Sequence, residues 1–142
     1  MRHKTAEIYW HYPKSIYSIT KDPQYDGYLG VYAIYRKFGV NETLLYIGKA
    51  DKCSVRSRLK EHLKYWLSSY RGDKIVRIGE ILKPYPLLSE HIEDIESGLI
   101  YETQPIVNVS KRATYFCCNF HNILNTGYRG RLPRNISMYW QE

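Results

Sequence analysis

The chain has 142 residues, a net charge of +7 and a pI near 9.3. A hydrophobic fraction of 44% is enough for one core, so length and composition predict a single globular domain and exclude a disordered tail. No run of about eighteen apolar residues occurs, and polar and aromatic residues follow Met1, which argues against a membrane span or a secretion signal. Three cysteines, two of them adjacent, do not make a disulfide framework, so we expect a cytoplasmic protein.

The basic surplus predicts a polyanionic partner, either nucleic acid or an anionic membrane, and charge alone does not choose between them. Residues 111–142 carry five basic groups and one acidic group, whereas residues 28–110 carry twelve and ten. We therefore expect Arg129, Arg131 and Arg134 to contact a nucleic-acid backbone. The alternative is a basic loop with no partner.

Residues 31–35 and 44–47 are rich in β-branched and aromatic side chains and predict the two strands of a β-hairpin. If the turn is centred on Gly39, Tyr32 falls opposite Tyr46. The hairpin then places two phenol groups on one face.

Ser54 predicts the N-cap of a helix. Its buried face follows helical spacing through Val55, Leu59, His62 and Trp66. Arg58 lies one turn before His62, so a guanidinium that can fork onto phosphate stands beside an imidazole that can orient or deprotonate a hydroxyl. A surface cation beside a histidine at the edge of the core is the alternative. Arg56 and Lys60 lie towards another face, where we expect them to contact nucleic acid.

Residues 76–82 predict a third strand, and a second helix is expected to begin near Ser89 and end before Pro105. Glu96 lies on or beside the apolar face of this helix, where an unpaired carboxylate is costly. Two partners fit: an ion pair with a nearby arginine, or a Mg²⁺ ion, which often takes only one or two protein carboxylates. Glu93 and other nearby acids are expected to be solvated.

The predicted fold class is α+β, with a small, mainly antiparallel three-stranded sheet flanked by helices. Residues 28–110 form the core of a single domain that spans 1–142. Residues 1–27 are expected to form an N-terminal extension and residues 111–142 a basic C-terminal extension.

Five short motifs follow one another along this core: Gly30-Val31-Tyr32, Tyr46-Ile47-Gly48-Lys49, Arg58-Leu59-x-x-His62, Glu96 and Asn108. In order and approximate spacing they resemble the GIY-YIG nuclease family, with a valine in the first tripeptide that keeps a β-branched residue. The interval from Gly48 to Arg58 is two residues longer than in several members, and Arg56 fits the shorter spacing. The catalytic arginine is therefore left open between the two, with the four-residue step to His62 favouring Arg58.

The resemblance implies a metal-dependent DNA endonuclease that hydrolyses phosphodiester bonds and needs Mg²⁺, for which Mn²⁺ can substitute. It implies that Glu96 holds the metal and that Tyr32 activates water, assisted by His62 and by Lys49 or Tyr46. Arg58 would stabilise the transition state electrostatically. Asn108 would hold the shape of the site.

The implied partner is double-stranded DNA rather than a membrane, and a homodimer would allow both strands to be cut. The absence of a visible recognition module or second repair domain favours a restriction-type or defence nuclease. Two alternatives remain: a structure-specific or RNA-directed nuclease with the same site, and a module that binds nucleic acid without cutting it.

Overall fold

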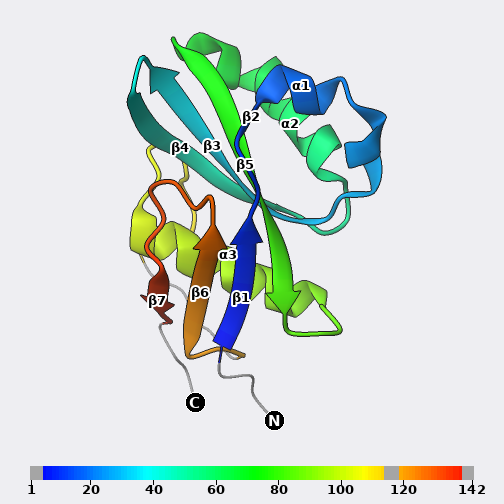
Figure 1. The fold of residues 1–142 in the computed structure, drawn as a ribbon, viewed down its shortest axis with the longest axis vertical. Helices are drawn as coiled ribbons and strands as arrows, with labels where there is room; N and C mark the ends of the chain where they lie inside the picture. The colour runs from blue at the N-terminus through cyan, green and yellow to red at the C-terminus, as the bar shows by residue number, and fades with distance from the viewer. Residues whose placement is uncertain (1–4, 114–118, 139–142) are drawn as a thin grey trace.

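The computed structural model describes residues 5–113 and 119–138, which form an α+β fold around one curled, mixed sheet (Figure 1). The strands are β1 (Thr5–Trp10), β2 (Lys14–Ser15), β3 (Gly30–Phe38), β4 (Asn41–Ala50), β5 (Asp73–Lys83), β6 (Asn122–Gly127) and β7 (Asn135–Ser137). The helices are α1 (Ile16–Thr20), α2 (Val55–Tyr65) and α3 (Ser89–Thr103), with short 3₁₀ turns η1 (Pro23–Gly27) and η2 (Leu67–Ser69).

The sheet is larger than the sequence predicts. Its strand order is β4-β3-β5-β1-β6-β7, with β2 paired to β5. Strands β3, β4 and β5 form the expected antiparallel unit, but β1 joins the free edge of β5 and pairs in parallel with β6. The prediction of a small three-stranded sheet is therefore wrong, because residues of both flanks contribute strands to the same sheet.

The β3–β4 hairpin is confirmed, but its predicted register is wrong. Gly39, with φ +58°, opens a two-residue turn, a backbone conformation that favours glycine. One residue, Leu45, is then bulged out, because Ile34 pairs with Tyr46 while the next residue of β3 pairs with Leu44. Together these changes move the partner of Tyr32 from Tyr46 to Gly48.

Both predicted helices and the third strand are confirmed. Ser54 caps α2, since its side chain accepts a hydrogen bond from the Ser57 amide at 3.2 Å. Helix α3 ends at Thr103, and its C-cap Gln104 adopts a left-handed conformation directly before Pro105. Local sequence signals therefore set these two helix ends: a capping serine precedes α2, and a proline follows α3.

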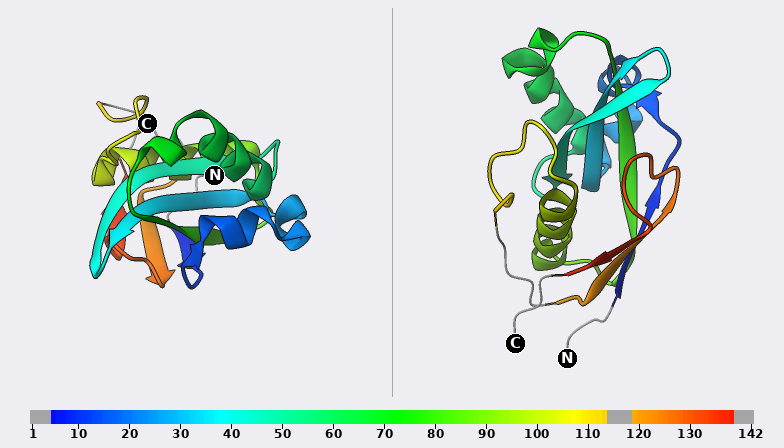
Figure 2. Two further views of the ribbon diagram at one scale, coloured as in Figure 1. Left: turned by 90° about the horizontal axis from the view of Figure 1, so that it is seen from above. Right: turned by 90° about the vertical axis from the view of Figure 1, so that its left-hand side faces the viewer.

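Alternating residues of β3 face two different apolar cores. Tyr32 and Ile34 belong to the core covered by α1 and α2, whereas Val31 and Ala33 belong to the core covered by α3. Figure 2 shows α3 on one side of the sheet made by β1, β6 and β7, and Figure 1 shows α1 and α2 beside the upper parts of β3, β4 and β5. The strand that carries Tyr32 thus runs between two packed layers.

Among the helices within residues 5–113 and 119–138, none has both the length and the apolar character needed to cross a bilayer. Cys53 is exposed with a free thiol. The adjacent pair Cys117 and Cys118 lies outside the described residues.

A buried polar contact joins the parallel strands β1 and β6. Trp10 Nε1 donates to Asn125 Oδ1 at 2.8 Å, and both side chains are fully buried. The side-chain nitrogen Nδ2 of Asn125 in turn donates to the Pro133 carbonyl at 2.9 Å, which connects the loop after β6 to the same asparagine.

Asn125→Ala leaves the buried indole N–H without an acceptor. We expect this substitution to lower the free energy of unfolding by about 1–3 kcal/mol, measured by urea denaturation. Asn122→Ala, in the same strand but partly exposed, is the control and should have a small effect. An unchanged denaturation midpoint for Asn125→Ala would contradict the integration of β6 into the fold.

Candidate active site

Strands β3 and β4 pack closely at Gly48, where two tyrosine side chains contact the backbone. A Cβ atom placed there would lie 2.5 Å from Tyr32 Cζ and 2.8 Å from Tyr46 Cε2. No side chain fits at this position, so glycine lets both phenol rings approach the backbone of β4. The rings of Tyr32 and Tyr46 lie 6.4 Å apart as a result.

His62 is held between two other aromatic side chains. Trp66 Nε1 donates to His62 Nδ1 at 2.8 Å, and His62 Nε2 lies 2.8 Å from the Tyr32 hydroxyl. An indole N–H can only donate, so Nδ1 carries no proton and the neutral ring carries its proton on Nε2. His62 therefore donates a hydrogen bond to the oxygen of Tyr32.

The imidazole is also kept uncharged. Burial lowers the pKa of His62 to about 4, and the positive charge of Arg58 acts in the same direction. At neutral pH His62 is thus a hydrogen-bond donor to Tyr32 and has no free nitrogen with which to accept the phenolic proton.

The two phenols differ in burial but respond to the same nearby cation. Tyr32 is fully buried, whereas Tyr46 is only partly buried. Burial raises the pKa of both hydroxyls, with a further rise at Tyr32 from Tyr46 and at Tyr46 from Glu96, while Arg58 opposes the rise at both. Arg58 thus favours ionisation of both phenols, and Lys111 acts in the same direction at Tyr46.

The two candidate arginines of α2 have different surroundings. Arg58 and Glu96 line the same cavity of about 180 Å³, here called the Glu96 pocket, with Lys49 and the loop 50–53. Arg56 points instead to η1 and α1, with Nη1 2.9 Å from Asp26 Oδ1 and Nε donating to a backbone carbonyl of α1. The geometry gives Arg56 a role in fixing α2 and leaves Arg58 facing the pocket.

Glu96 is 7% exposed and pairs with a lysine rather than with an arginine. Lys111 Nζ lies 2.5 Å from Glu96 Oε1 and 2.7 Å from Glu93 Oε1. Burial raises the pKa of Glu96, and the hydrogen bond and charge of Lys111 oppose that rise. Glu93 is half-exposed but paired, so the expectation that it is simply solvated is incomplete.

Lys49 is a fixed cation of the same cluster. Its Nζ lies 2.6 Å from Glu93 Oε2 and 3.7 Å from Asp51 Oδ2. Burial alone would lower the pKa of Lys49, but the contacts with these carboxylates outweigh it and the net pKa is raised. Lys49 therefore stays protonated and cannot act as a general base.

Asn108 acts on the backbone of β4. Its Oδ1 accepts from the Ile47 amide and its Nδ2 donates to the Ile47 carbonyl, both at 2.9 Å. The amide of Val107 also donates to the Leu45 carbonyl at 2.8 Å. This segment closes the edge of β4 next to the bulge and holds the strand that carries Tyr46.

The residues expected to contact nucleic acid do not gather at the pocket. Lys60 is exposed on α2. Arg129, Arg131 and Arg134 lie in the β6–β7 loop, and the Arg131 guanidinium donates to the Glu42 carbonyl from Nε (3.1 Å) and Nη2 (2.9 Å). That contact lies near the Gly39 turn, at the other end of the hairpin from Gly48.

Trp66 and Lys111 belong to the site, but sequence reasoning did not assign them a role in it. Trp66 had a usable signal, since it lies four residues after His62 on the same helix face. Lys111 had no such signal, because it lies in the loop that follows α3, where helical spacing does not relate it to Glu96. Its backbone adopts a positive φ of 68°. Within the described part of the chain, no group of three or more His, Cys, Asp or Glu side chains is arranged to hold a metal ion.

Comparison of this chain with known protein families, curated proteins and solved structures finds no match.

The lowered pKa of His62 makes folding depend on pH. Between pH 6.5 and about 4 the unfolded chain binds a proton at this position that the folded chain does not, so stability falls as pH falls through this window. We expect the wild type to lose up to roughly 3 kcal/mol more than His62→Gln over this range, measured by urea unfolding. Parallel pH profiles for the two proteins would contradict the buried neutral state of His62.

Proposed function

We propose that the chain is a metal-dependent phosphodiesterase that cuts nucleic acid, with DNA as its substrate and a GIY-YIG-like site. The observation that carries this proposal is the shared pocket. Arg58 and Glu96, from two different helices, line one cavity, and Arg58 also faces the phenols of Tyr32 and Tyr46. An anion-binding group and a carboxylate in one pocket, with two phenols next to the arginine, are the components of phosphodiester hydrolysis.

Arg58 is the group that binds the scissile phosphate. Its side chain is partly exposed to the pocket, and its partner Glu61 is a distant 3.4 Å away and half-exposed. The guanidinium can therefore exchange that contact for phosphate oxygens, which it binds with two parallel hydrogen bonds. In the transition state the same charge stabilises the additional negative charge on the phosphoryl oxygens.

The donor set fits a Mg²⁺ ion held mainly by Glu96. Mg²⁺ commonly takes one or two protein carboxylates and completes its shell with water and substrate phosphate, and Glu96 and Asp51 are acidic residues that line this pocket. When bound there, the ion would neutralise charge on the phosphate and the leaving oxygen. Lys111 already contacts Glu96 Oε1, so it competes with any divalent ion for this carboxylate.

Proton transfer falls to the phenols. His62 donates to the Tyr32 oxygen and Arg58 supplies a nearby positive charge, and both interactions favour the phenolate. We assign the base to Tyr32, with the less buried Tyr46 as the assisting residue. His62 keeps the phenol oriented and does not take its proton.

The role of Glu96 as a metal ligand is tested with a matched pair of variants. Glu96→Gln keeps the side-chain shape but removes the charge needed to hold a metal, so Mg²⁺-dependent nicking of plasmid DNA should fall at least about a hundredfold. Salt-sensitive DNA binding should persist.

Glu93→Gln is the control, because Glu93 also contacts Lys111 but does not line the Glu96 pocket. It should keep most of the activity. Normal nicking by Glu96→Gln, or equal losses in the two variants, would refute the assignment of Glu96.

Phenylalanine substitutions separate the two tyrosines, since each removes one hydroxyl and keeps the ring. Tyr32→Phe should lower the single-turnover cleavage rate by about 10²–10⁴-fold, the usual contribution of a general base, and Tyr46→Phe should lower it less. A near-normal rate for Tyr32→Phe with a large loss for Tyr46→Phe would move the base to Tyr46.

A further inference from the structure

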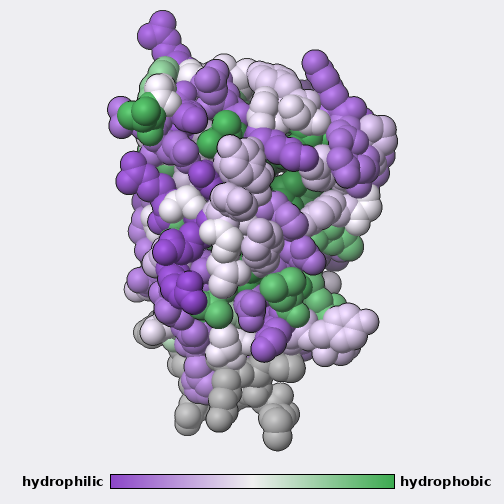
Figure 3. Space-filling model, in the orientation of Figure 1, coloured by the Kyte–Doolittle hydropathy of each residue, from purple (hydrophilic) through white to green (hydrophobic). Residues whose placement is uncertain are grey.

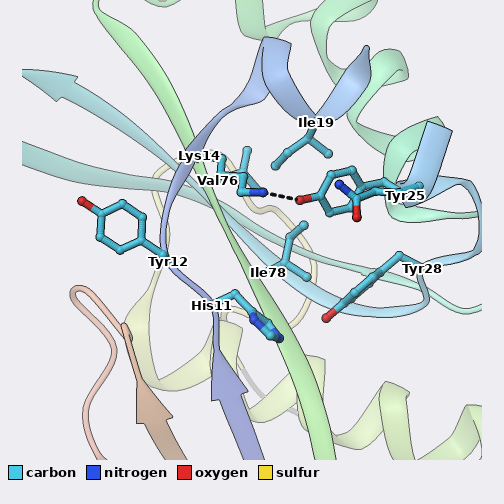
Figure 4. Close-up of a pocket in the computed structure, with 9 residues that line it drawn as sticks. His11, Tyr12, Lys14, Ile19, Tyr25, Tyr28, Val76 and Ile78 are labelled. Carbon is cyan, nitrogen blue, oxygen red and sulfur yellow. Dashed lines mark hydrogen bonds between the residues drawn. The ribbon is translucent and has the colours of Figure 1, made fainter. Parts of the chain in front are cut away.

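A second cavity lies on the same side of β3 as Tyr32 and is larger than the Glu96 pocket. It has a volume of about 310 Å³ and lies between the β1–β2 connection and the segment α1–η1, over strand β5. Figure 4 shows Ile78 of β5 between His11 and Lys14 on one side and Tyr25 and Tyr28 on the other. It is called here the Tyr28 pocket, and nothing in the proposed reaction uses it.

The walls of the Tyr28 pocket are aromatic and its floor is aliphatic. Tyr28 lies 6.1 Å from the ring of Tyr25 and 6.5 Å from that of His11, and the His11 ring meets it edge-on at 85°. Ile78 and Val76 form the floor and are almost completely buried. Such a cavity favours a flat ligand that stacks on rings and covers apolar surface.

The rim is polar and carries a positive charge. Lys14 Nζ donates to the Tyr25 hydroxyl at 2.9 Å, as Figure 4 shows, and the amide side chain of Gln24 also lines the cavity. Burial and the negative charge of Glu80 raise the pKa of Tyr28 to about 12, so its hydroxyl remains a neutral hydrogen-bond donor. A flat ligand with polar edges and an attached negative charge matches this rim.

The cavity is connected to the candidate active site through backbone. The Tyr28 carbonyl accepts a hydrogen bond at 2.9 Å from the amide of Val55, the first residue of α2, and Ile78 pairs with Tyr32 across β3 and β5. Adjacent strands lie about 4.8 Å apart, so β5 is roughly 10 Å from β4, the strand that leads to the Glu96 pocket. The floor of the Tyr28 pocket is therefore two strands away from the strand that leads to the Glu96 pocket.

We propose that the Tyr28 pocket binds one unpaired nucleobase of the nucleic-acid substrate, with Lys14 contacting the adjoining phosphate. The identity of the polymer rests on the proposed function, whereas the recognition of a base does not. Stacking on tyrosine is open to any base, so the pocket reads an unpaired base rather than a sequence. The preferred substrate is then DNA with a bulge, branch or single-stranded segment.

The character of the surrounding surface favours this ligand over a protein partner. The face in Figure 3 is hydrophilic for the most part, and its hydrophobic residues form small separate patches. Protein interfaces have an apolar centre that excludes charge, whereas here the chain has a net charge of +7 and places a lysine at the mouth of the cavity.

The test compares two labelled duplexes by fluorescence anisotropy in EDTA, one with a single unpaired adenosine and one with an abasic residue at the same position. The full-length wild type should bind the unpaired base about tenfold more tightly. Tyr28→Leu, which removes the ring, should bring this ratio close to one, and Tyr28→Phe should keep it. Equal affinity of the wild type for the two duplexes would overturn the proposal.

Two further variants guard against a loss of folding. Tyr65→Leu is the matched control, because Tyr65 is an exposed tyrosine on α2 that does not line the pocket, and it should keep the preference. His11→Ala removes a half-exposed ring from the opposite wall and should weaken the preference. An unaltered preference in both His11→Ala and Tyr28→Leu would also overturn the proposal.

Small ligands distinguish a base from a protein side chain. In saturation-transfer NMR we expect the pocket to bind AMP more strongly than ribose 5-phosphate or N-acetyltyrosinamide. Binding of the tyrosine amide alone would assign the cavity to a protein partner and refute the inference. Cleavage is not part of either readout, so a protein that prefers unpaired bases but never cuts would refute only the proposed function.

Discussion

Trp66 donates its indole N–H to His62 Nδ1, and that bond decides which nitrogen of the imidazole faces Tyr32. Because the indole cannot accept, the remaining proton sits on Nε2 and points at the phenolic oxygen. The arrangement requires that α2 approach β3 closely, which in turn requires glycine at position 48 so that the two phenol rings can lie on the backbone of β4. The chemistry of the site therefore depends on packing at one point.

The same packing joins groups that are remote in the sequence. Helix α2 brings Arg58 and His62, the hairpin brings the phenols, and α3 brings Glu96 to the edge of β4. Asn108 then locks this edge through both hydrogen-bonding groups of Ile47. Within this frame, Arg58 and Lys52 are exposed or partly exposed cations of the Glu96 pocket, whereas Lys49 and Lys111 are engaged by carboxylates.

Much of the central fold could be predicted because its signals are local. A serine cap, a proline stop and runs of β-branched residues defined α2, α3, β3, β4 and β5. The register of the hairpin could not be predicted, since the bulge at Leu45 has no local signature. Strand β1 did carry a signal, the alternation that buries Ala6, Ile8 and Trp10, but its partner β6 contains a buried asparagine that is typical of a loop.

The site was predictable to the extent that its residues follow helix spacing. The step from Arg58 to His62 placed both on neighbouring turns, and the same spacing extends to Trp66. The contact of Lys111 with Glu96 depends on a loop that follows α3, so no periodicity could indicate it. Separating Arg56 from Arg58 likewise needed the position of Asp26 in η1, thirty residues earlier in the chain.

The protonation of the His62 ring is the most direct test of this account. Nitrogen NMR of the chain labelled with ¹⁵N-histidine reports which ring nitrogen carries the proton, and His62→Gln identifies the resonances. We expect a proton on Nε2 and a bare Nδ1 from pH 5 to 8, with little change across this range because the pKa of His62 is about 4. A proton on Nδ1, or a doubly protonated ring at pH 6, would contradict it.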